Sequence, residues 1–470
     1  MEHLTTSVAV LGGGPGGYTA AFRAADLGLS VCLIEQYDRL GGVCLNVGCI
    51  PSKNLLHGAA LIEEARKGRE RGIVFAPPEI DLDAFRNHKE SVVRKLTDGL
   101  DALCKARNIT RLIGRGTFVD RTTLLVTGQD SETKVRFTDV IIATGSHPMA
   151  LPNCPDDPRI WDSTTALALT SIPKRLLIIG GGIIGMEMAQ VYGALGAAVT
   201  IVELQEQIIP PADRDLVEPL LGTLSKNYAL FTRTRVTAIT AETEGIRVAL
   251  EGEKAPADGL FDAVLVAVGR RANTRGFGLE TVGLQPDQQG FLTVNAQQQT
   301  DIPHFYAIGD VVGEPMLAHK ASHQGKVAAE VIAGKKTAFA PMTIPSVAYT
   351  HPEIAWMGLT ERDAKAQHIA FVKGVFPWSA NGRALCSGAE KGLSKILFDK
   401  QSGRIIGAGI CGHNAGELIH EAVLALEMGA NAEDISKTVH AHPTLAETFA
   451  FAAEMVDGSI TDLLPPKKGG

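Results

Sequence analysis

The chain has 470 residues, of which 45% are hydrophobic and 21% are charged, and its formal net charge is −7 at pH 7. This length predicts about three domains rather than one. Acidic and basic residues are interspersed, so the sequence gives no basic patch for nucleic acid and no surface suited to an acidic membrane. The seven cysteines are too few and too scattered for a secreted disulfide framework.

The sequence also argues against export or membrane insertion. No apolar run reaches the roughly 18 residues that a bilayer-spanning helix needs. An apolar, strand-like run begins within eight residues of Met1, which leaves no room for a signal or transit peptide. We therefore expect a cytoplasmic protein.

The first 35 residues predict a dinucleotide-binding unit. An apolar run, a glycine-rich turn, a helix-forming stretch and a second apolar run follow one another from residue 7. Gly12 allows the tight turn, Gly14 leaves room for a pyrophosphate, and Gly17 lets helix and strand pack closely. Glu35 ends the second run and is the acid expected beside ribose hydroxyls.

Two cysteines with four residues between them occupy the segment GGVCLNVGCIPSK at 41–53. On an ideal helix the Cα atoms of Cys44 and Cys49 would lie about 8.7 Å apart, whereas a disulfide tolerates no more than about 7 Å. We expect Gly48 to distort the turn and Pro51 to keep the residue before it out of the helical region, so that a bridge can close. The pattern favours a reducible redox pair. Two unrelated core thiols are the alternative, and a zinc site would need further ligands.

The following segments predict structural elements rather than chemistry. Residues 54–70 and 84–107 have helical periodicity with charged faces, and residues 110–140 have the pattern of short strands. The last of these strands closes in a small-residue turn at Gly145, where backbone can approach a ligand. Four prolines between residues 148 and 158 mark a domain boundary.

The opening pattern then returns in the middle of the chain. The glycines and the acid recur 168 positions after their counterparts, as Gly180, Gly182, Gly185 and Glu203. Two such units in one chain are hard to explain by chance. A carboxylate at Glu203 accepts from a ribose 2′-hydroxyl and repels a 2′-phosphate, and the next arginine is Arg214, so NAD is favoured over NADP.

Two later motifs carry residues that suit ligand binding or acid/base chemistry. A strand ends in Asp310 ahead of a helical stretch, and this acid either binds a ligand hydroxyl or serves as a turn residue. The segment HAHPTLAE at 440–447 places Pro443 at an expected helix start, with His442 just before it. Glu447 then either orients an imidazole for catalysis or forms a structural pair with it.

Together these segments resemble the pyridine nucleotide-disulfide oxidoreductase family over nearly the full chain. The most specific motifs are the segments 41–53 and 440–447. The resemblance implies an α/β fold with two Rossmann-like dinucleotide-binding domains and a C-terminal α+β dimerisation domain. It places an FAD-binding domain at 1–150, completed by 271–344, an NAD-binding domain at 151–270, and the dimerisation domain at 345–470.

The resemblance also implies which residues hold the two cofactors, and it implies no metal. The FAD site would contain Gly12, Gly14, Gly17, Glu35, Lys53, Gly116, Gly145, Asp310 and Ala318. The NAD site would contain Gly180, Gly182, Gly185, Glu187, Glu203, Val236 and Gly269.

The implied activity is NAD-dependent oxidation of dihydrolipoamide through a Cys44–Cys49 disulfide. His442, oriented by Glu447, would serve as acid/base for the dithiol of the partner subunit in a homodimer. The implied partner is a lipoyl-bearing acyltransferase or a lipoyl carrier protein of a 2-oxo acid dehydrogenase or glycine cleavage complex. A non-catalytic flavoprotein scaffold or a redox sensor is the alternative from a different functional class.

Overall fold

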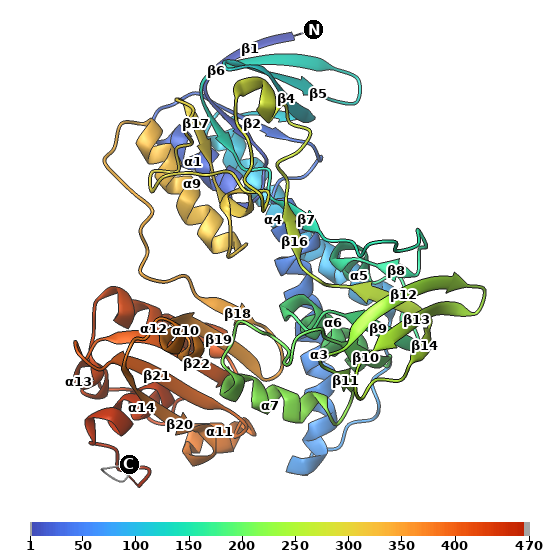
Figure 1. Cartoon of the computed structure of the whole chain (residues 1–470), viewed down its shortest axis with the longest axis vertical. Helices are drawn as coiled ribbons and strands as arrows, with labels where there is room; N and C mark the ends of the chain where they lie inside the picture. Colours follow the sequence, from blue (N-terminus) through green and yellow to red (C-terminus); the bar gives the residue numbers. More distant parts are fainter. Residues whose placement is uncertain (1, 465–470) are drawn as a thin grey trace.

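The computed structural model describes residues 2–464, so the last six residues of the predicted third domain lie outside the described part. The chain forms α/β units in which β-sheets are covered by helices, with the sheet of the first unit at the top of Figure 1 and the main sheets of the other two units below it. The predicted fold class is confirmed. Within the described residues, no helix is long and apolar enough to cross a membrane.

The first unit is built on a seven-stranded sheet with β1 at its centre. β1 (Glu2–Leu11) pairs in parallel with β2 (Val31–Glu35) on one side and β6 (Glu132–Ile142) on the other. The remaining strands are β3 (Thr110–Ile113), β4 (Arg115–Asp120), β5 (Thr123–Thr127) and β17 (Phe305–Ala307). Because β17 pairs with β6, the chain returns to this sheet after building the second unit.

The second unit repeats the parallel arrangement. Its sheet has the order β11-β10-β9-β15-β8, with β9 (Arg175–Ile179) flanked by β10 (Ala198–Val202) and β15 (Ala263–Val266). Its edge strands are β8 (Ile160–Trp161) and β11 (Ala229–Phe231). An antiparallel sheet of β12 (Arg235–Glu242), β13 (Gly245–Glu251) and β14 (Asp258–Phe261) extends from it.

The helices that open these units start directly after the glycine turns. α1 (Pro15–Asp26) packs against α9 (Ala318–Ile332) in the first unit, and α6 (Ile183–Ala194) covers the second. The buried faces of α1 and α6 carry mostly small or apolar side chains, which allows helix and strand to approach closely.

A helix break separates the two cysteines. α2 (Gly42–Val47) holds Cys44, and α3 (Cys49–Lys67) begins with Cys49. Gly48 between them has φ −144° and ψ −115°, and a Cβ there would lie 2.8 Å from the Val43 carbonyl oxygen. The distortion expected at Gly48 is therefore present.

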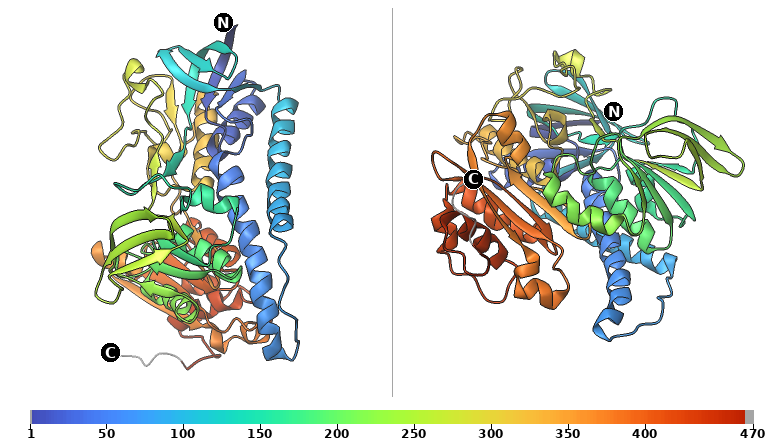
Figure 2. Two further views of the ribbon diagram at one scale, coloured as in Figure 1. Left: turned by 90° about the vertical axis from the view of Figure 1, so that its right-hand side faces the viewer. Right: turned by 60° about the horizontal axis from the view of Figure 1, so that its bottom comes forward.

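The expectation for Pro51 was wrong, because the residue before it is helical. Pro51 lies in the first turn of α3, where backbone N–H groups have no intrahelical partner and the missing N–H of proline costs nothing. Beyond this turn α3 lies beside α4 (Leu82–Ala106) along one edge of the molecule (Figure 2).

The third unit is an antiparallel sheet with helices. Its strands are β18 (Ser346–Ala348), β19 (Glu353–Gly358), β20 (Phe371–Pro377), β21 (Leu393–Asp399) and β22 (Ile405–Gly412). α12 (Ala415–Glu427), α13 (Ala432–Ser436) and α14 (Glu447–Asp457) follow. The expected helix start at Pro443 was wrong, since α14 begins at Glu447 and Pro443 lies in a turn after a cis peptide bond.

A buried cation joins the third unit to the second. The Lys395 ammonium on β21 lies 2.8 Å from Asp213 and 2.6 Å from Asp215, at the start of α7 (Arg214–Leu224), and 3.1 Å from Glu361. Burial by itself would lower the pKa of Lys395, but its hydrogen bonds to the two aspartates outweigh this and raise it. The carboxylates cluster closely only because Lys395 neutralises them.

Replacing this cation is expected to destabilise the protein. Lys395→Met leaves Asp213 and Asp215 without their cation, while Glu361 keeps Lys373 and Lys365. The expected cost is about 3 kcal/mol, because breaking a buried ion pair leaves uncompensated charge. The thermal unfolding midpoint measures the loss. Lys437→Met, which removes an exposed pair with Glu433, is the control and should leave the midpoint unchanged. Equal midpoints for both variants would contradict the prediction.

Candidate active site

One large cavity brings the predicted site residues together. Its volume is 2320 Å³, well above the range of about 300–1,000 Å³ for sites of drug-sized ligands. The cavity is lined by both glycine-rich turns and both cysteines of segment 41–53. Residues of the third unit, as far along the chain as Glu427, also line it. The cavity is large enough for two dinucleotides that meet near the cysteines.

The two glycine turns have nearly the same geometry. Gly12 has φ +108° and Gly180 has φ +110°, and a Cβ at either would lie 2.2 or 2.3 Å from a neighbouring carbonyl oxygen. A Cβ at Gly17 or Gly185 would lie within 2.0 Å of the carbonyl oxygen of the turn's first glycine. These four glycines are therefore required by the packing of the turns themselves.

The middle glycines are different. Gly14 and Gly182 cap α1 and α6 with φ −72°, which any residue adopts. A Cβ at Gly182 would meet nothing within 4 Å, and one at Gly14 would only touch Gly42 at 3.9 Å. The protein itself does not require glycine at either position. Leaving both helix N-termini uncovered fits a phosphate group that approaches the free N–H groups.

The acids at the ends of β2 and β10 are anchored in the same way. The Gly13 N–H donates to Glu35 Oε2 at 2.7 Å, and the Gly181 N–H donates to Glu203 Oε2 at 2.5 Å. Burial raises the pKa of Glu35, while the backbone donors counteract this. Both carboxylates are held against their glycine turns, where ribose hydroxyls of a bound dinucleotide would reach them.

The two thiols form one hydrogen-bonded unit. Cys44 donates to the Cys49 sulfur, and this bond lowers the pKa of Cys49 to about 7 against the effect of burial, with help from the charge of Lys53. The same bond, together with burial, raises the pKa of Cys44. Cys49 is thus the more acidic thiol of the pair and the first to ionise as the pH rises.

An ion pair between the first and second units lies beside the thiols. Lys53 Nζ contacts Glu187 Oε1 at 2.9 Å and Oε2 at 3.0 Å. The Tyr349 ring lies 4.5 Å from the same ammonium, and the Tyr349 N–H donates to Glu187 at 3.1 Å. Side chains from all three units therefore meet at Lys53.

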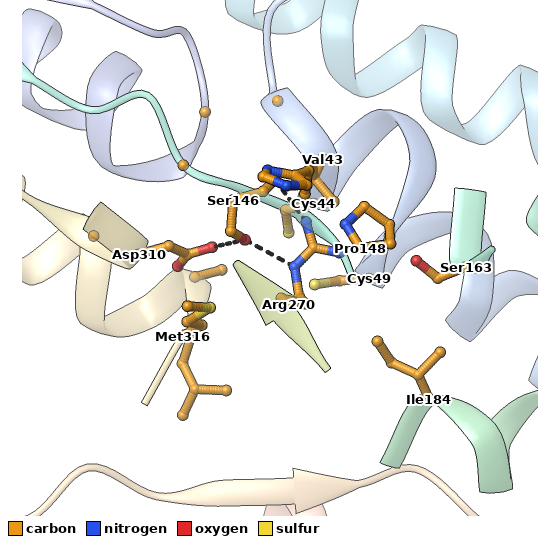
Figure 3. Close-up of a pocket in the computed structure, with 18 of the residues that line it drawn as sticks. Val43, Cys44, Cys49, Ser146, Pro148, Ser163, Ile184, Arg270, Asp310 and Met316 are labelled. Carbon is orange, nitrogen blue, oxygen red and sulfur yellow. Dashed lines mark hydrogen bonds between the residues drawn. The ribbon is translucent and has the colours of Figure 1, made fainter. Parts of the chain in front are cut away.

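Asp310 belongs to a second polar chain in the cavity (Figure 3). The Ser146 hydroxyl donates to Asp310 Oδ2 at 2.5 Å. Arg270 donates through Nε to the Ser146 hydroxyl and through Nη2 to its carbonyl oxygen, both at 2.8 Å. Ser146 thereby occupies one oxygen of Asp310 and leaves the other for a ligand hydroxyl.

The structure does not bring His442 to the cavity. His442 Nδ1 lies 2.8 Å from Glu447 Oε1, and the Thr444 N–H donates to Oε2 at 2.7 Å, so the glutamate is fixed from both sides. The His442 side chain is 79% exposed, whereas His440 is buried against Glu421 at 2.7 Å. His442 alone in this segment presents a free ring nitrogen to solvent.

The comparisons with known proteins agree with this arrangement. The family model described as pyridine nucleotide-disulphide oxidoreductase matches residues 6–325, and its dimerisation domain matches residues 344–453. The chain belongs to this family. Dihydrolipoyl dehydrogenase of Vibrio parahaemolyticus is 52% identical over 469 residues, which cover 99% of this chain and 98% of the relative.

Solved structures show the same fold. LpdA from Mycobacterium tuberculosis has a TM-score of 0.89 and 27% identity, covering 97% of this chain and 100% of its own. The HOCl-induced flavoprotein disulfide reductase RclA from Escherichia coli has a TM-score of 0.83 and 25% identity, covering 94% and 98%. As a member of this family, the chain is an oxidoreductase that uses FAD and NAD.

In this family member, most predicted site residues line the cavity. Those that do are Gly12, Gly14, Glu35, Cys44, Cys49, Lys53, Gly116, Gly145, Gly180, Gly182, Glu187, Glu203, Val236, Gly269, Asp310 and Ala318. Gly17 and Gly185 lie beneath the turns, and His442 and Glu447 lie elsewhere. Sequence reasoning missed Ser146, Arg270 and Tyr349, which carry no local motif.

The uncovered N-terminus of α6 generates a prediction. Gly182→Ala is expected to fold normally, because its backbone angles suit alanine, but to bind NAD about tenfold more weakly because the methyl group displaces a charged phosphate from its N–H donors. Titration of NADH fluorescence measures the affinity. FAD content should be unchanged. In contrast, Gly185→Ala should lower the unfolding midpoint, and normal NADH affinity in Gly182→Ala would refute the assignment.

Proposed function

We propose that the chain oxidises dihydrolipoamide to lipoamide with reduction of NAD⁺ to NADH. The observation that carries the proposal is the Cys44–Cys49 pair in a cavity bounded by both glycine turns. The relative at 52% identity, named dihydrolipoyl dehydrogenase, supports this substrate over other disulfides. FAD, when bound, supplies the two-electron transfer between the thiols and NAD⁺.

The two cysteines have different tasks in this proposal. A thiolate of dihydrolipoamide attacks Cys44 of the oxidised pair, and Cys49 leaves as a thiolate. The lowered pKa of Cys49 makes it the better leaving group. The second substrate thiol then attacks the mixed disulfide and releases Cys44, so lipoamide leaves with two electrons and two protons fewer. The Cys44 hydrogen bond and Lys53 hold the charge on Cys49.

The cofactor residues are assigned by their place in the cavity. We assign FAD to the first glycine turn, with Glu35 at its ribose and Asp310 at its polyol chain. We assign NAD to the second turn, with Glu203 at its ribose. The Lys53–Glu187 ion pair lies between the two assigned sites, beside Cys49. The remaining assigned residues that line the cavity are Gly116, Gly145 and Ala318 for FAD and Val236 and Gly269 for NAD. Gly17 and Gly185 are assigned through the turns above them.

Assembly completes the site in this proposal. The dimerisation-domain match over residues 344–453 supports a homodimer. Glu447 holds His442 Nδ1, which leaves Nε2 free on a largely exposed side chain. His442 of the partner subunit would then exchange the thiol proton. A lipoyl-bearing protein of a cytoplasmic 2-oxo acid dehydrogenase or glycine cleavage complex would supply the substrate.

A steady-state assay tests the proposed reaction. With dihydrolipoamide as donor, kcat/KM for NAD⁺ should exceed that for NADP⁺ about 100-fold, because Glu203 repels a 2′-phosphate. Cys49→Ser should retain FAD and lose turnover, since the thiolate is the relay. A preference for NADP⁺, faster reduction of glutathione disulfide, or turnover by Cys49→Ser would overturn the proposal.

The role of His442 is tested separately. His442→Gln should lower lipoamide turnover about 10²-fold or more, the usual contribution of a general acid/base. FAD content and the unfolding midpoint should stay unchanged, because the side chain is largely exposed. His368→Gln makes the same substitution at an exposed position and serves as the control. Near-normal turnover in His442→Gln would leave it only a structural role.

A further inference from the structure

Arg270 is one of several cations lining the cavity that the proposed reaction has not used; the others include Arg39, Arg115, Arg235, Arg275 and Lys320. It starts β16 (Arg270–Ala272), directly after the Gly269 turn that closes the second unit. β16 pairs with β7 (Ser146–Pro148) from the first unit, so the segment that leaves one unit is held against the other. The side chain of Arg270 follows this pairing into the cavity (Figure 3).

The contacts of Arg270 are specific. Its guanidinium binds both oxygens of Ser146 in a fork, a geometry that a lysine ammonium does not reproduce. Ser146 is 3% exposed, and its hydroxyl accepts from Arg270 while donating to Asp310. A substitution of Arg270 is therefore expected to alter the position of Asp310, because the buried Ser146 hydroxyl connects the two side chains.

The charges around Arg270 include the thiolate of the pair. Burial lowers the pKa of Arg270, and the negative groups that counteract this are Asp310, Cys49 and Asp162. An arginine stays protonated in such a site, so its charge is permanent. Arg270 and Cys49 line the same cavity and lie next to each other in Figure 3, so a cation at Arg270 also favours the thiolate form of Cys49.

We propose that Arg270 is a positioning residue of the dithiol centre, which fixes Asp310 for FAD through Ser146 and places a permanent positive charge beside Cys49. The inference rests on the proposed function, because in that reaction the positive charge stabilises the Cys49 thiolate. The other charged or titratable groups that face Cys49 are Tyr18 from α1, Cys44 from α2, Lys53 from α3, Glu187 from α6 and Tyr349 from the third unit. Lys53 is paired directly with Glu187, whereas Arg270 hydrogen-bonds the neutral Ser146 and reaches the Asp310 carboxylate only through it.

The experiment separates the two roles with Arg270→Gln and Arg270→Lys. Two quantities are measured on the full-length protein: the dissociation constant of FAD, by flavin fluorescence, and the pH midpoint of Cys49 alkylation by iodoacetamide after reduction. Peptide mass spectrometry distinguishes Cys49 from the exposed Cys386. Arg271→Gln, at the exposed neighbouring residue of the same strand, is the matched control.

Arg270→Gln should weaken FAD binding about tenfold, because a charged hydrogen-bond donor to Ser146 is lost. It should also raise the alkylation midpoint by about one pH unit, because the thiolate loses a nearby cation. Arg270→Lys should restore the midpoint but not the FAD affinity, since it keeps the charge and loses the fork. A merely structural arginine would not give this separation.

The inference would be overturned if either the FAD dissociation constant or the alkylation midpoint were unchanged in Arg270→Gln. It would also be overturned if Arg271→Gln gave the same shifts. Failure of the proposed function looks different. The wild-type protein would then bind no FAD or fail to oxidise dihydrolipoamide, whereas the alkylation midpoint can be compared in every variant without turnover. Circular dichroism of Arg270→Gln checks that the chain is folded, and Arg270→Lys keeps the test decisive if it is not.

Discussion

The contact between the Cys44 thiol and the Cys49 sulfur is the interaction around which the cavity is organised. It exists because the helix breaks at Gly48, where a side chain would collide with the Val43 carbonyl oxygen. The break turns two positions that an ideal helix would hold apart into a hydrogen-bonded pair. That bond makes the sulfurs unequal and leaves Cys49 as the acidic member.

The two nucleotide units reach this pair from different parts of the chain. Their turns share the same backbone angles and the same anchoring of a carboxylate by a backbone N–H, although the helices they open face different regions of the cavity. Lys53 and Glu187 connect the units at the thiols, and Lys395 holds the third unit to the second. These ion pairs add to a hydrophobic cluster that joins Leu55 of the first unit and Trp356 of the third unit to the core of the second.

Local patterns predicted much of this architecture, because a glycine turn between a strand and a helix is a short-range feature of the sequence. The repeated glycines predicted both strand–turn–helix units, and Gly48 predicted the helix break. The positions assigned to Pro51 and Pro443 were wrong, since proline suits both a first helical turn and an irregular turn. Ser146 and Arg270 were missed because 124 residues separate them and only the β7–β16 pairing brings them together.

The exposure of His442 has a consequence for dimers that combine an intact subunit with a damaged one. Its carboxylate partner is buried in its own chain, whereas the imidazole faces outward, so in the proposed homodimer each subunit donates its histidine and depends on its neighbour for one. A subunit that lacks a working His442 would inactivate the dithiol of its intact neighbour. Its own dithiol would stay active, because the neighbour supplies the histidine. In a dimer of one damaged and one intact subunit, the dithiol that loses activity is therefore that of the intact subunit.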